Sequence, residues 1–204
     1  MTATGRLSTS SPNFQNIPIR TEDGKEIRKA IKAQSNEYQI FSADYSQVEL
    51  RVMAHLSGDE SLISALNNGE DIHTFTAKNI FNVDNDDMVL PEMRRIAKIV
   101  NFGIMYGAGP FRLSQELDIP FGEAKQIKDA YFEKYQGIEQ YIENSKLQIK
   151  ETKSVETLLG RKRAVWDSDS QNKIRRDAAE RMAINMPIQG LSLIHISEPT
   201  RPLG

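Results

Sequence analysis

The sequence predicts a mainly α-helical fold with a small β component, an α+β protein. Apolar residues recur at helical spacing over most of the chain, and glycine or proline interrupts the pattern at the ends of the segments. Only two places have a strand-like pattern: an apolar run at 39–43 and a hairpin pattern around Gly160. The 204 residues suffice for one large domain or two small ones, and 39% hydrophobic and 26% charged residues are typical of a globular protein.

The first quarter of the chain is expected to be less regular than the rest. Residues 1–20 are rich in Ser, Thr, Asn and Pro and have neither a helical nor a strand period, which predicts an extended loop. A short helix is expected at 23–32, and the strand at 39–43 should end at Asp44. A further helix should begin near Gln47, end near residue 57 and be closed by Gly58.

Helices are expected to make up most of the remaining chain. Asp71 is placed to cap a helix at 71–81, and Pro91 suits the first turn of a helix at 92–106 that a Gly-Ala-Gly-Pro run ends. A basic hairpin is expected around Gly160. The other expected helices cover residues 62–66, 111–117, 122–135, 138–152 and 177–186.

Composition narrows the kinds of site that the chain can hold. Cysteine is absent, which excludes disulfides and thiolate metal sites and fits a reducing compartment, so any metal must be held by oxygen or histidine. No apolar run approaches the roughly 20 residues of a membrane span, and Met1 does not open a signal-peptide pattern. We therefore expect a soluble cytoplasmic protein with no membrane partner.

The charges are clustered, although the formal net charge is only −2. Local patches rather than net charge decide what a face attracts, so basic clusters keep a nucleic-acid partner open. The alternative is that each cluster is an ordinary solvated face. The basic clusters comprise Arg94, Arg95 and Lys98, then Arg161, Lys162 and Arg163, and then Lys173, Arg175, Arg176 and Arg181.

The predicted helix at 92–106 has the most informative spacing. Arg94, Lys98, Phe102 and Tyr106 are four residues apart, which places two cations and then two aromatic rings along one stripe. A nucleoside triphosphate is likewise anionic at one end and aromatic at the other. An amphipathic helix with core aromatics and cations at the rim would have the same spacing, so the stripe alone leaves both interpretations open.

Asp44 is a candidate metal ligand. A carboxylate at a strand end, followed by Ser46, Gln47 and Glu49, could hold one ion of a two-metal phosphoryl-transfer site. A single aspartate before a helix is more often an N-cap, and Glu49 with Arg51 could form a surface ion pair. Spacing does not separate these alternatives.

Longer motifs resemble a known family. "DYSQVELRVMAHLSGD" from Asp44 resembles motif A of family A DNA polymerases, and "RRIAKIVNFGIMYG" from Arg94 resembles their motif B. Similar matches are "TATGRLSTSSPNFQNIP", "GEDIHTFTA" and "ERMAINMPIQG". The resemblance covers Thr2 to Gly190 and implies the fingers plus an incomplete palm of a right-hand polymerase. Under this resemblance, residues 1–58 would form a part of the palm that contains motif A, and residues 59–152 would form the fingers with the motif B helix. Residues 153–190 would form a further part of the palm, with a helix that contacts the primer-template.

The resemblance also implies roles for single residues. Asp44 and Lys98 would be catalytic, Asp44 and the Tyr45 carbonyl would bind metal, and Glu49 would exclude the ribose 2′-hydroxyl. The nucleotide-binding residues implied are Arg20, Gln47, Glu49, His73, Arg94, Lys98, Phe102 and Tyr106. The DNA-binding residues implied are Arg6, Asn13, Gln15, Gly107, Arg181, Asn185 and Gln189.

The implied reaction is template-directed addition of deoxynucleoside triphosphates (dNTPs) to a primer 3′-hydroxyl. It implies two Mg²⁺ ions as cofactors and primer-template DNA and dNTPs as partners, with no obligate oligomer. A piece of a single-subunit phage-type RNA polymerase is an alternative, against which Glu49 and the surroundings of Phe102 argue. A non-catalytic nucleotide- or nucleic-acid-binding remnant is a second alternative.

The two ends depart from the family pattern. After Gly190 the family continues to a His-Asp-Glu hairpin with the second metal aspartate, whereas this chain has "LSLIHISEPTRPLG". We expect residues 191–204, including the isolated His195, to be a non-native tail translated from a sequencing adapter. Thumb residues are expected to be missing before Thr2. The 204-residue chain is accordingly expected to be an inactive fragment when alone.

Overall fold

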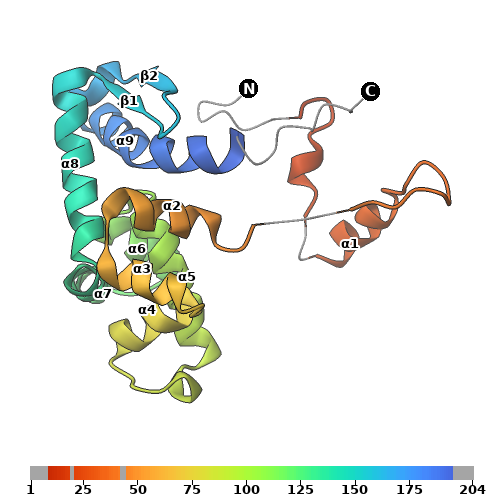
Figure 1. Cartoon of the computed structure of the whole chain (residues 1–204), viewed down its shortest axis with the longest axis horizontal. Coiled ribbons are helices and arrows are strands. Elements are labelled where there is room, and N and C mark those ends of the chain that lie inside the picture. The colour runs from red at the N-terminus through yellow and green to blue at the C-terminus, as the bar shows by residue number, and fades with distance from the viewer. Residues whose placement is uncertain (1–8, 19–20, 42–44, 195–204) are drawn as a thin grey trace. The chain divides into compact units, whose positions relative to one another are not determined.

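The computed structural model describes residues 9–18, 21–41 and 45–194. These fall into two compact units, Met1–Gln47 and Val48–Gly204, which are described separately (Figure 1). The predicted mainly helical fold with a little sheet is confirmed. None of the described helices is both long enough and apolar enough to cross a membrane.

The described residues of the first unit form one short α-helix. A 3₁₀ turn, η1 (Phe14–Asn16), precedes α1 (Glu22–Lys29), and the Thr21 hydroxyl caps α1 by accepting a hydrogen bond from the Gly24 amide at 3.2 Å. The strand predicted at 39–43 is wrong for residues 39–41, which are not in a strand. Phe41 is 89% exposed and no described strand lies beside it, so its backbone lacks the ladder partners that a strand requires. Residues 42–44 lie outside the described part of the chain.

Between residues 48 and 194, the regular structure of the second unit is helical except for one hairpin. Its predicted helices are confirmed, with most boundaries within about two residues of the expected ones and α9 longer than expected. The helices are α2 (Val48–Ser57), α3 (Glu60–Asn67), α4 (Ile72–Phe81), α5 (Pro91–Met105), α6 (Pro110–Leu117), α7 (Phe121–Lys134), α8 (Gln136–Thr152) and α9 (Lys173–Ile194). Two 3₁₀ turns, η2 (Asp86–Met88) and η3 (Trp166–Asp169), complete the unit with strands β1 (Ser154–Glu156) and β2 (Lys162–Ala164).

Local chemistry fixes where these helices begin and end. Asp59 and Asp71 cap α3 and α4, accepting hydrogen bonds from the backbone amides of Leu62 and Thr74 at 2.9 and 2.8 Å. Proline occupies the first turn of α5 and of α6, where its missing N–H costs nothing. Gly107 follows α5 with φ of 74°, a conformation that residues with a Cβ adopt only under strain.

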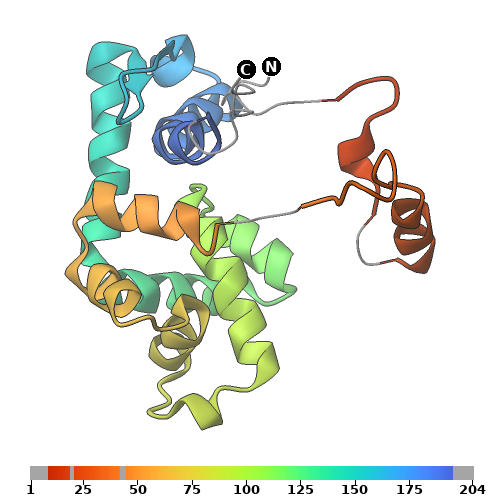
Figure 2. The same cartoon turned by 45° about the vertical axis from the view of Figure 1, so that its right-hand side comes forward.

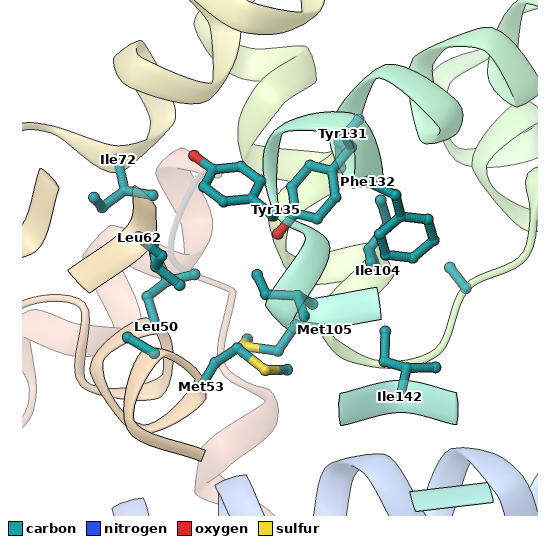
Figure 3. Packing of buried hydrophobic residues seen from close by; sticks show 14 of the residues in the cluster. Leu50, Met53, Leu62, Ile72, Ile104, Met105, Tyr131, Phe132, Tyr135 and Ile142 are labelled. Carbon is teal, nitrogen blue, oxygen red and sulfur yellow. The ribbon is translucent and has the colours of Figure 1, made fainter. Parts of the chain in front are cut away.

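A large core joins α2 to α8. Leu50 and Met53 of α2 lie with Ile72 of α4, Met105 of α5 and Tyr135 of the α7–α8 junction in one buried cluster (Figure 3). The cluster continues into α9 through two buried isoleucines, Ile184 and Ile188. Burial of this apolar surface, rather than helix propensity, stabilises the arrangement that positions α4 and α5.

A smaller core lies at the hairpin end of α8. β1 and β2 are antiparallel, with Val155 opposite Arg163 and Gly160 in the turn between them, as predicted. Val155 is buried with Ile149 of α8 and Met186 of α9. Figures 1 and 2 show α8 running from the α7 end of this unit to the hairpin, so that it spans both cores.

Candidate nucleotide site on helix α5

Two neighbouring helices, α4 and α5, bring the first part of the site together. Arg94, in the first turn of α5, reaches Asp71, the N-cap of α4: Arg94 Nη2 donates to Asp71 Oδ2 at 2.7 Å and Nε donates to Oδ1 at 3.3 Å. This fork-to-carboxylate geometry fixes the guanidinium in one plane. Lys98 is exposed one turn further along α5.

The Asp71–Arg94 pair shifts the titration of both groups. Burial of the Asp71 carboxyl raises its pKa, but the hydrogen bonds from Arg94 and from the Thr74 backbone outweigh burial and lower the pKa to about 2. The hydrogen bond to Asp71 raises the pKa of Arg94. Both groups are therefore charged at neutral pH, and the cation is held at the start of α5.

The aromatic part of the stripe lies against His73. The ring centroids of Phe102 and His73 are 5.6 Å apart, and those of Phe102 and Tyr106 are 6.2 Å apart with an angle of 29° between their planes. Phe102 and Tyr106 are half-buried against the large core, whereas Arg94 and Lys98 are exposed. The four-residue spacing thus places a cationic end and an aromatic end on one helix. Because the two rings also contact the large core, the structure agrees equally with an ordinary amphipathic helix.

Glu49 of α2 lies at the aromatic end of the stripe. The Tyr106 hydroxyl donates a hydrogen bond to Glu49 Oε2, joining residues 57 positions apart. The Glu49 side chain therefore lies directly against the Tyr106 hydroxyl at this end of the stripe.

A buried polar chain behind His73 was not predicted from the sequence. Asn101 Nδ2 is 3.1 Å from His73 Nδ1, Thr76 Oγ1 donates to Asn101 Oδ1 at 3.2 Å, and the Tyr135 hydroxyl is 2.9 Å from Thr76 Oγ1. Asn101, Thr76 and Tyr135 are at most 1% exposed. A polar residue at 101 inside the otherwise apolar "IVNFGIM" run was the one available sign in the sequence.

A second group of predicted residues gathers where α5 ends against α9. A Cβ on Gly107 would lie 3.2 Å from Arg181 Cγ, so the backbone there passes directly over α9. Arg181, Asn185 and Gln189 are spaced by four along α9 and share one side of it. Asn185 Oδ1 is buried and has no hydrogen-bond partner among the described residues. A cavity of about 290 Å³ adjoins this region, lined in part by Gly107, Arg181 and Glu180.

The remaining predicted residues belong to the first unit or fall outside the described residues. Arg6, Arg20 and Asp44 are in the latter group, as is His195. In the first unit, Asn13 Oδ1 accepts a hydrogen bond from the Gln15 amide at 3.0 Å. Tyr45 and Gln47 also belong to this unit. Helix α2 begins at Val48, and the alternative interpretations of Asp44 as a helix cap or a metal ligand fall outside the described residues.

Chemically, the second unit offers two cations and a histidine beside stacked aromatic rings. Such a set can hold a polyphosphate and a planar base at the same time. Among the described residues, no three histidine or carboxylate side chains lie together in a way that could hold a metal ion.

Comparison with known proteins assigns the family. The sequence model of DNA polymerase family A matches residues 1–193. The chain is 47% identical to the thermostable DNA polymerase I of Thermus filiformis over 210 residues, covering 100% of this chain and 25% of that protein. It is 50% identical to the DNA polymerase I of Bacillus subtilis, covering 93% of this chain and 22% of that protein. The chain thus spans about a quarter of the length of these relatives.

A solved structure agrees with the sequence comparison. The POL domain of Pol1 from M. smegmatis, in complex with DNA primer-template and dNTP, superposes with a TM-score of 0.84 at 45% identity, covering 93% of this chain and 33% of that one. The relatives are DNA polymerases, so the phage-type RNA polymerase alternative is not supported. On sequence and structure together, the chain belongs to DNA polymerase family A.

Proposed function

We propose that this chain supplies the dNTP-binding helix and part of the primer-template surface of a DNA-directed DNA polymerase. The observation that carries the proposal is the α5 stripe, in which exposed Arg94 and Lys98 precede the stacked Phe102 and Tyr106, with His73 alongside. The cations neutralise triphosphate charge as the α-phosphate is attacked by the primer 3′-hydroxyl. Phe102 and Tyr106 pack on the sugar and the base.

Glu49 sets the choice of sugar in this proposal. Its carboxylate, held by the Tyr106 hydroxyl, occupies the space that a ribose 2′-hydroxyl would need. A ribonucleotide would have to displace or desolvate this carboxylate, which disfavours it relative to a deoxyribonucleotide.

The DNA contacts are proposed for both units. Arg181, Asn185 and Gln189 on α9, with Gly107, would meet the duplex, and the unsatisfied Asn185 Oδ1 is an acceptor that a base or sugar edge could satisfy. Arg6, Asn13 and Gln15 would contact the same duplex, and Arg20 and Gln47 the nucleotide. In this proposal, residues 1–58 and 153–190 form part of the palm, and residues 59–152 form the fingers.

Mg²⁺ is the cofactor that we propose. The Asp44 carboxylate and the Tyr45 carbonyl are oxygen donors, which Mg²⁺ prefers, and would be two of its ligands. The bound ions would activate the primer hydroxyl and neutralise the leaving pyrophosphate. The cytoplasm, where DNA and dNTPs meet in bacteria, is the proposed location.

The test is a chimaera in which residues 2–190 replace the matching segment of the Bacillus subtilis DNA polymerase I. It should extend a primed template with dNTPs, and Asp44→Ala should abolish extension. Lys98→Ala should lower kcat/KM by about 100-fold, as expected for a lost charge-assisted contact in the transition state.

Arg95→Ala is the matched control, because Arg95 neighbours the stripe but pairs with Glu92 at 2.5 Å. It should leave kcat/KM within about twofold of the parent, since exposed ion pairs contribute little. Extension that survives Asp44→Ala, or equal effects of Lys98→Ala and Arg95→Ala, would contradict the proposal.

A further inference from the structure

The polar chain behind His73 has a defined direction of hydrogen-bond donation. Thr76 donates its hydroxyl proton to Asn101 Oδ1, so the remaining bond of Thr76 Oγ1 must be accepted from the Tyr135 hydroxyl. With its Oδ1 accepting from Thr76, the Asn101 amide presents Nδ2, a donor, to His73. Each hydrogen bond in this polar chain is therefore donated in the direction from Tyr135 toward His73.

The far end of the chain is anchored in the core. The Tyr135 ring packs on Tyr131 with centroids 4.7 Å apart, and it reaches toward the side of the core where Ile72 of α4 lies (Figure 3). Burial raises the pKa of the Tyr135 hydroxyl, although the bond to Thr76 opposes this, so Tyr135 stays a donor at physiological pH. The direction of the chain is thus fixed by a group that does not titrate near neutrality.

This direction decides which nitrogen of His73 carries the proton. Nδ1 accepts from Asn101 and must be unprotonated, which leaves the proton on Nε2. Nε2 has no hydrogen-bond partner among the described residues, and His73 keeps 6% of its surface exposed. Nε2–H is therefore the group that His73 can offer to a ligand.

The charged groups around His73 favour the neutral ring. Burial lowers the pKa of His73; Asp71 on α4 opposes this, and Arg94 and Lys98 on α5 reinforce it. Protonation at Nδ1 would in addition break the bond from Asn101, because two donors would then face each other. The hydrogen bond from Asn101 and the nearby charges thus both favour the neutral form of His73.

We propose that Asn101, Thr76 and Tyr135 are positioning residues that hold His73 as the neutral Nε2–H tautomer, so that it donates a hydrogen bond to a triphosphate oxygen beside the cations Arg94 and Lys98. The triphosphate part of this inference rests on the proposed function. A neutral donor adds a directed bond without placing a third positive charge against Arg94 and Lys98, whose mutual repulsion an imidazolium would increase. The hydrogen-bonded chain links His73 to Tyr135, two residues that are 62 positions apart in the sequence. It therefore also connects the site to the α7–α8 junction.

The tautomer is measured by ¹⁵N-detected ring correlations of the histidines in the complete 204-residue chain between pH 6 and 8. His73 should show an unprotonated Nδ1 and a protonated Nε2 over this whole range. A protonated Nδ1, averaging between tautomers, or protonation of the His73 ring within this pH range would overturn the proposal. This measurement needs no variant.

Variants test whether the chain does the positioning. Asn101→Asp replaces the donor by an acceptor of the same shape, and should move the proton to Nδ1 and raise the pH at which His73 titrates. Thr76→Val and Tyr135→Phe should each produce tautomer averaging, whereas Tyr131→Phe, a buried ring outside the chain, should not. An unchanged spectrum in Thr76→Val and Tyr135→Phe would overturn the positioning role.

Titration with dGTP separates this inference from the proposed function. If both hold, dGTP shifts the Nε2 resonance of His73, and Tyr135→Phe weakens dGTP binding by about five- to tenfold, the effect of one compromised hydrogen bond to a charged group. Tyr131→Phe should bind as the parent does. A fixed Nε2–H tautomer without any response to dGTP would overturn the triphosphate role and leave the tautomer assignment standing.

Discussion

At the scale of single residues, the Glu49–Tyr106 bond shows how two distant side chains define one end of the candidate site. Tyr106 directly follows the last residue of α5 and Glu49 is the second residue of α2, yet the Tyr106 hydroxyl donates directly to the Glu49 carboxylate. The partner fixes the carboxylate, and a fixed group discriminates between ligands better than a mobile one.

Replacing Glu49 should therefore relax the choice of sugar. In the chimaera, Glu49→Ala should raise kcat/KM for a ribonucleotide relative to the matching dNTP by at least about tenfold, because about 1.4 kcal/mol of discrimination would be lost. Single-nucleotide extension kinetics measure the ratio. Glu92→Ala, an exposed carboxylate outside the stripe, is the control, and an unchanged ratio in Glu49→Ala would remove the assigned role.

The charge of Asp71 should make the stability of the fold depend on pH. Its folded-state pKa of about 2 lies below its ordinary value of 3.8, so its contribution is fully present above pH 4 and is lost as the pH falls toward 2. Since the side chain is 39% exposed, solvent screening limits this contribution to roughly 1 kcal/mol or less.

Asp71→Asn should keep the α4 cap but lose the ion pair with Arg94. Urea denaturation should show a lower free energy of unfolding than the parent at pH 7, by about 0.5–1 kcal/mol, and the difference should shrink between pH 4 and pH 2. A difference that stays constant over this range would show that the charge of Asp71 is not its cause.

At the scale of elements, the Asp59 side chain joins two helices, α3 and α8. Its Oδ1 caps α3, and its Oδ2 accepts from the Gly137 amide in the first turn of α8 at 2.9 Å. Gly137 has no room for a side chain, because a Cβ there would lie 2.9 Å from Asp59 Cα and 3.0 Å from Asp59 Cβ. The glycine thus permits close approach of α8 to the α2–α3 turn.

Gly137→Ala should accordingly destabilise the chain by about 1–3 kcal/mol, the usual cost of forcing extra volume into a packed contact. Gly122→Ala is a matched control in the first turn of α7, where a Cβ would meet nothing within 4 Å. It should be neutral or slightly stabilising, since alanine favours a helix. Equal unfolding midpoints for the two variants would contradict the close packing at Gly137.

At the scale of the whole molecule, most of the stabilising surface lies in the second unit. Its large core takes buried residues from α2 to α9, whereas the described buried hydrophobic residues include none from the first unit. Loss of one core side chain should therefore affect the cooperative unfolding of the entire second unit.

Leu50→Ala tests this expectation, because Leu50 is 1% exposed between α2 and the helices that pack on it. The free energy of unfolding, followed by far-ultraviolet circular dichroism in urea, should fall by about 2–5 kcal/mol. Leu147→Ala, at a position 57% exposed on α8, should change it by less than about 0.5 kcal/mol. A small effect at Leu50 would show that α2 is not part of the cooperative core.

Local rules were sufficient for the helices and the hairpin. Asp71, Pro91 and Gly160 mark boundaries that the structure confirms, because caps and turns depend on residues within a few positions. The strand at 39–41 failed for the opposite reason: an apolar run does not reveal whether a neighbouring strand exists.

By itself, the sequence determined the helical plan, the stripe from Arg94 to Tyr106 and the family of this protein. Only the tertiary structure decided what stands around that stripe: Glu49 against Tyr106, Asp71 against Arg94, and the buried chain from Tyr135 to His73. Helical spacing is a local property that the order of residues encodes directly. Contacts between residues 23 to 59 positions apart depend on how the helices pack, and no periodicity in the chain records them.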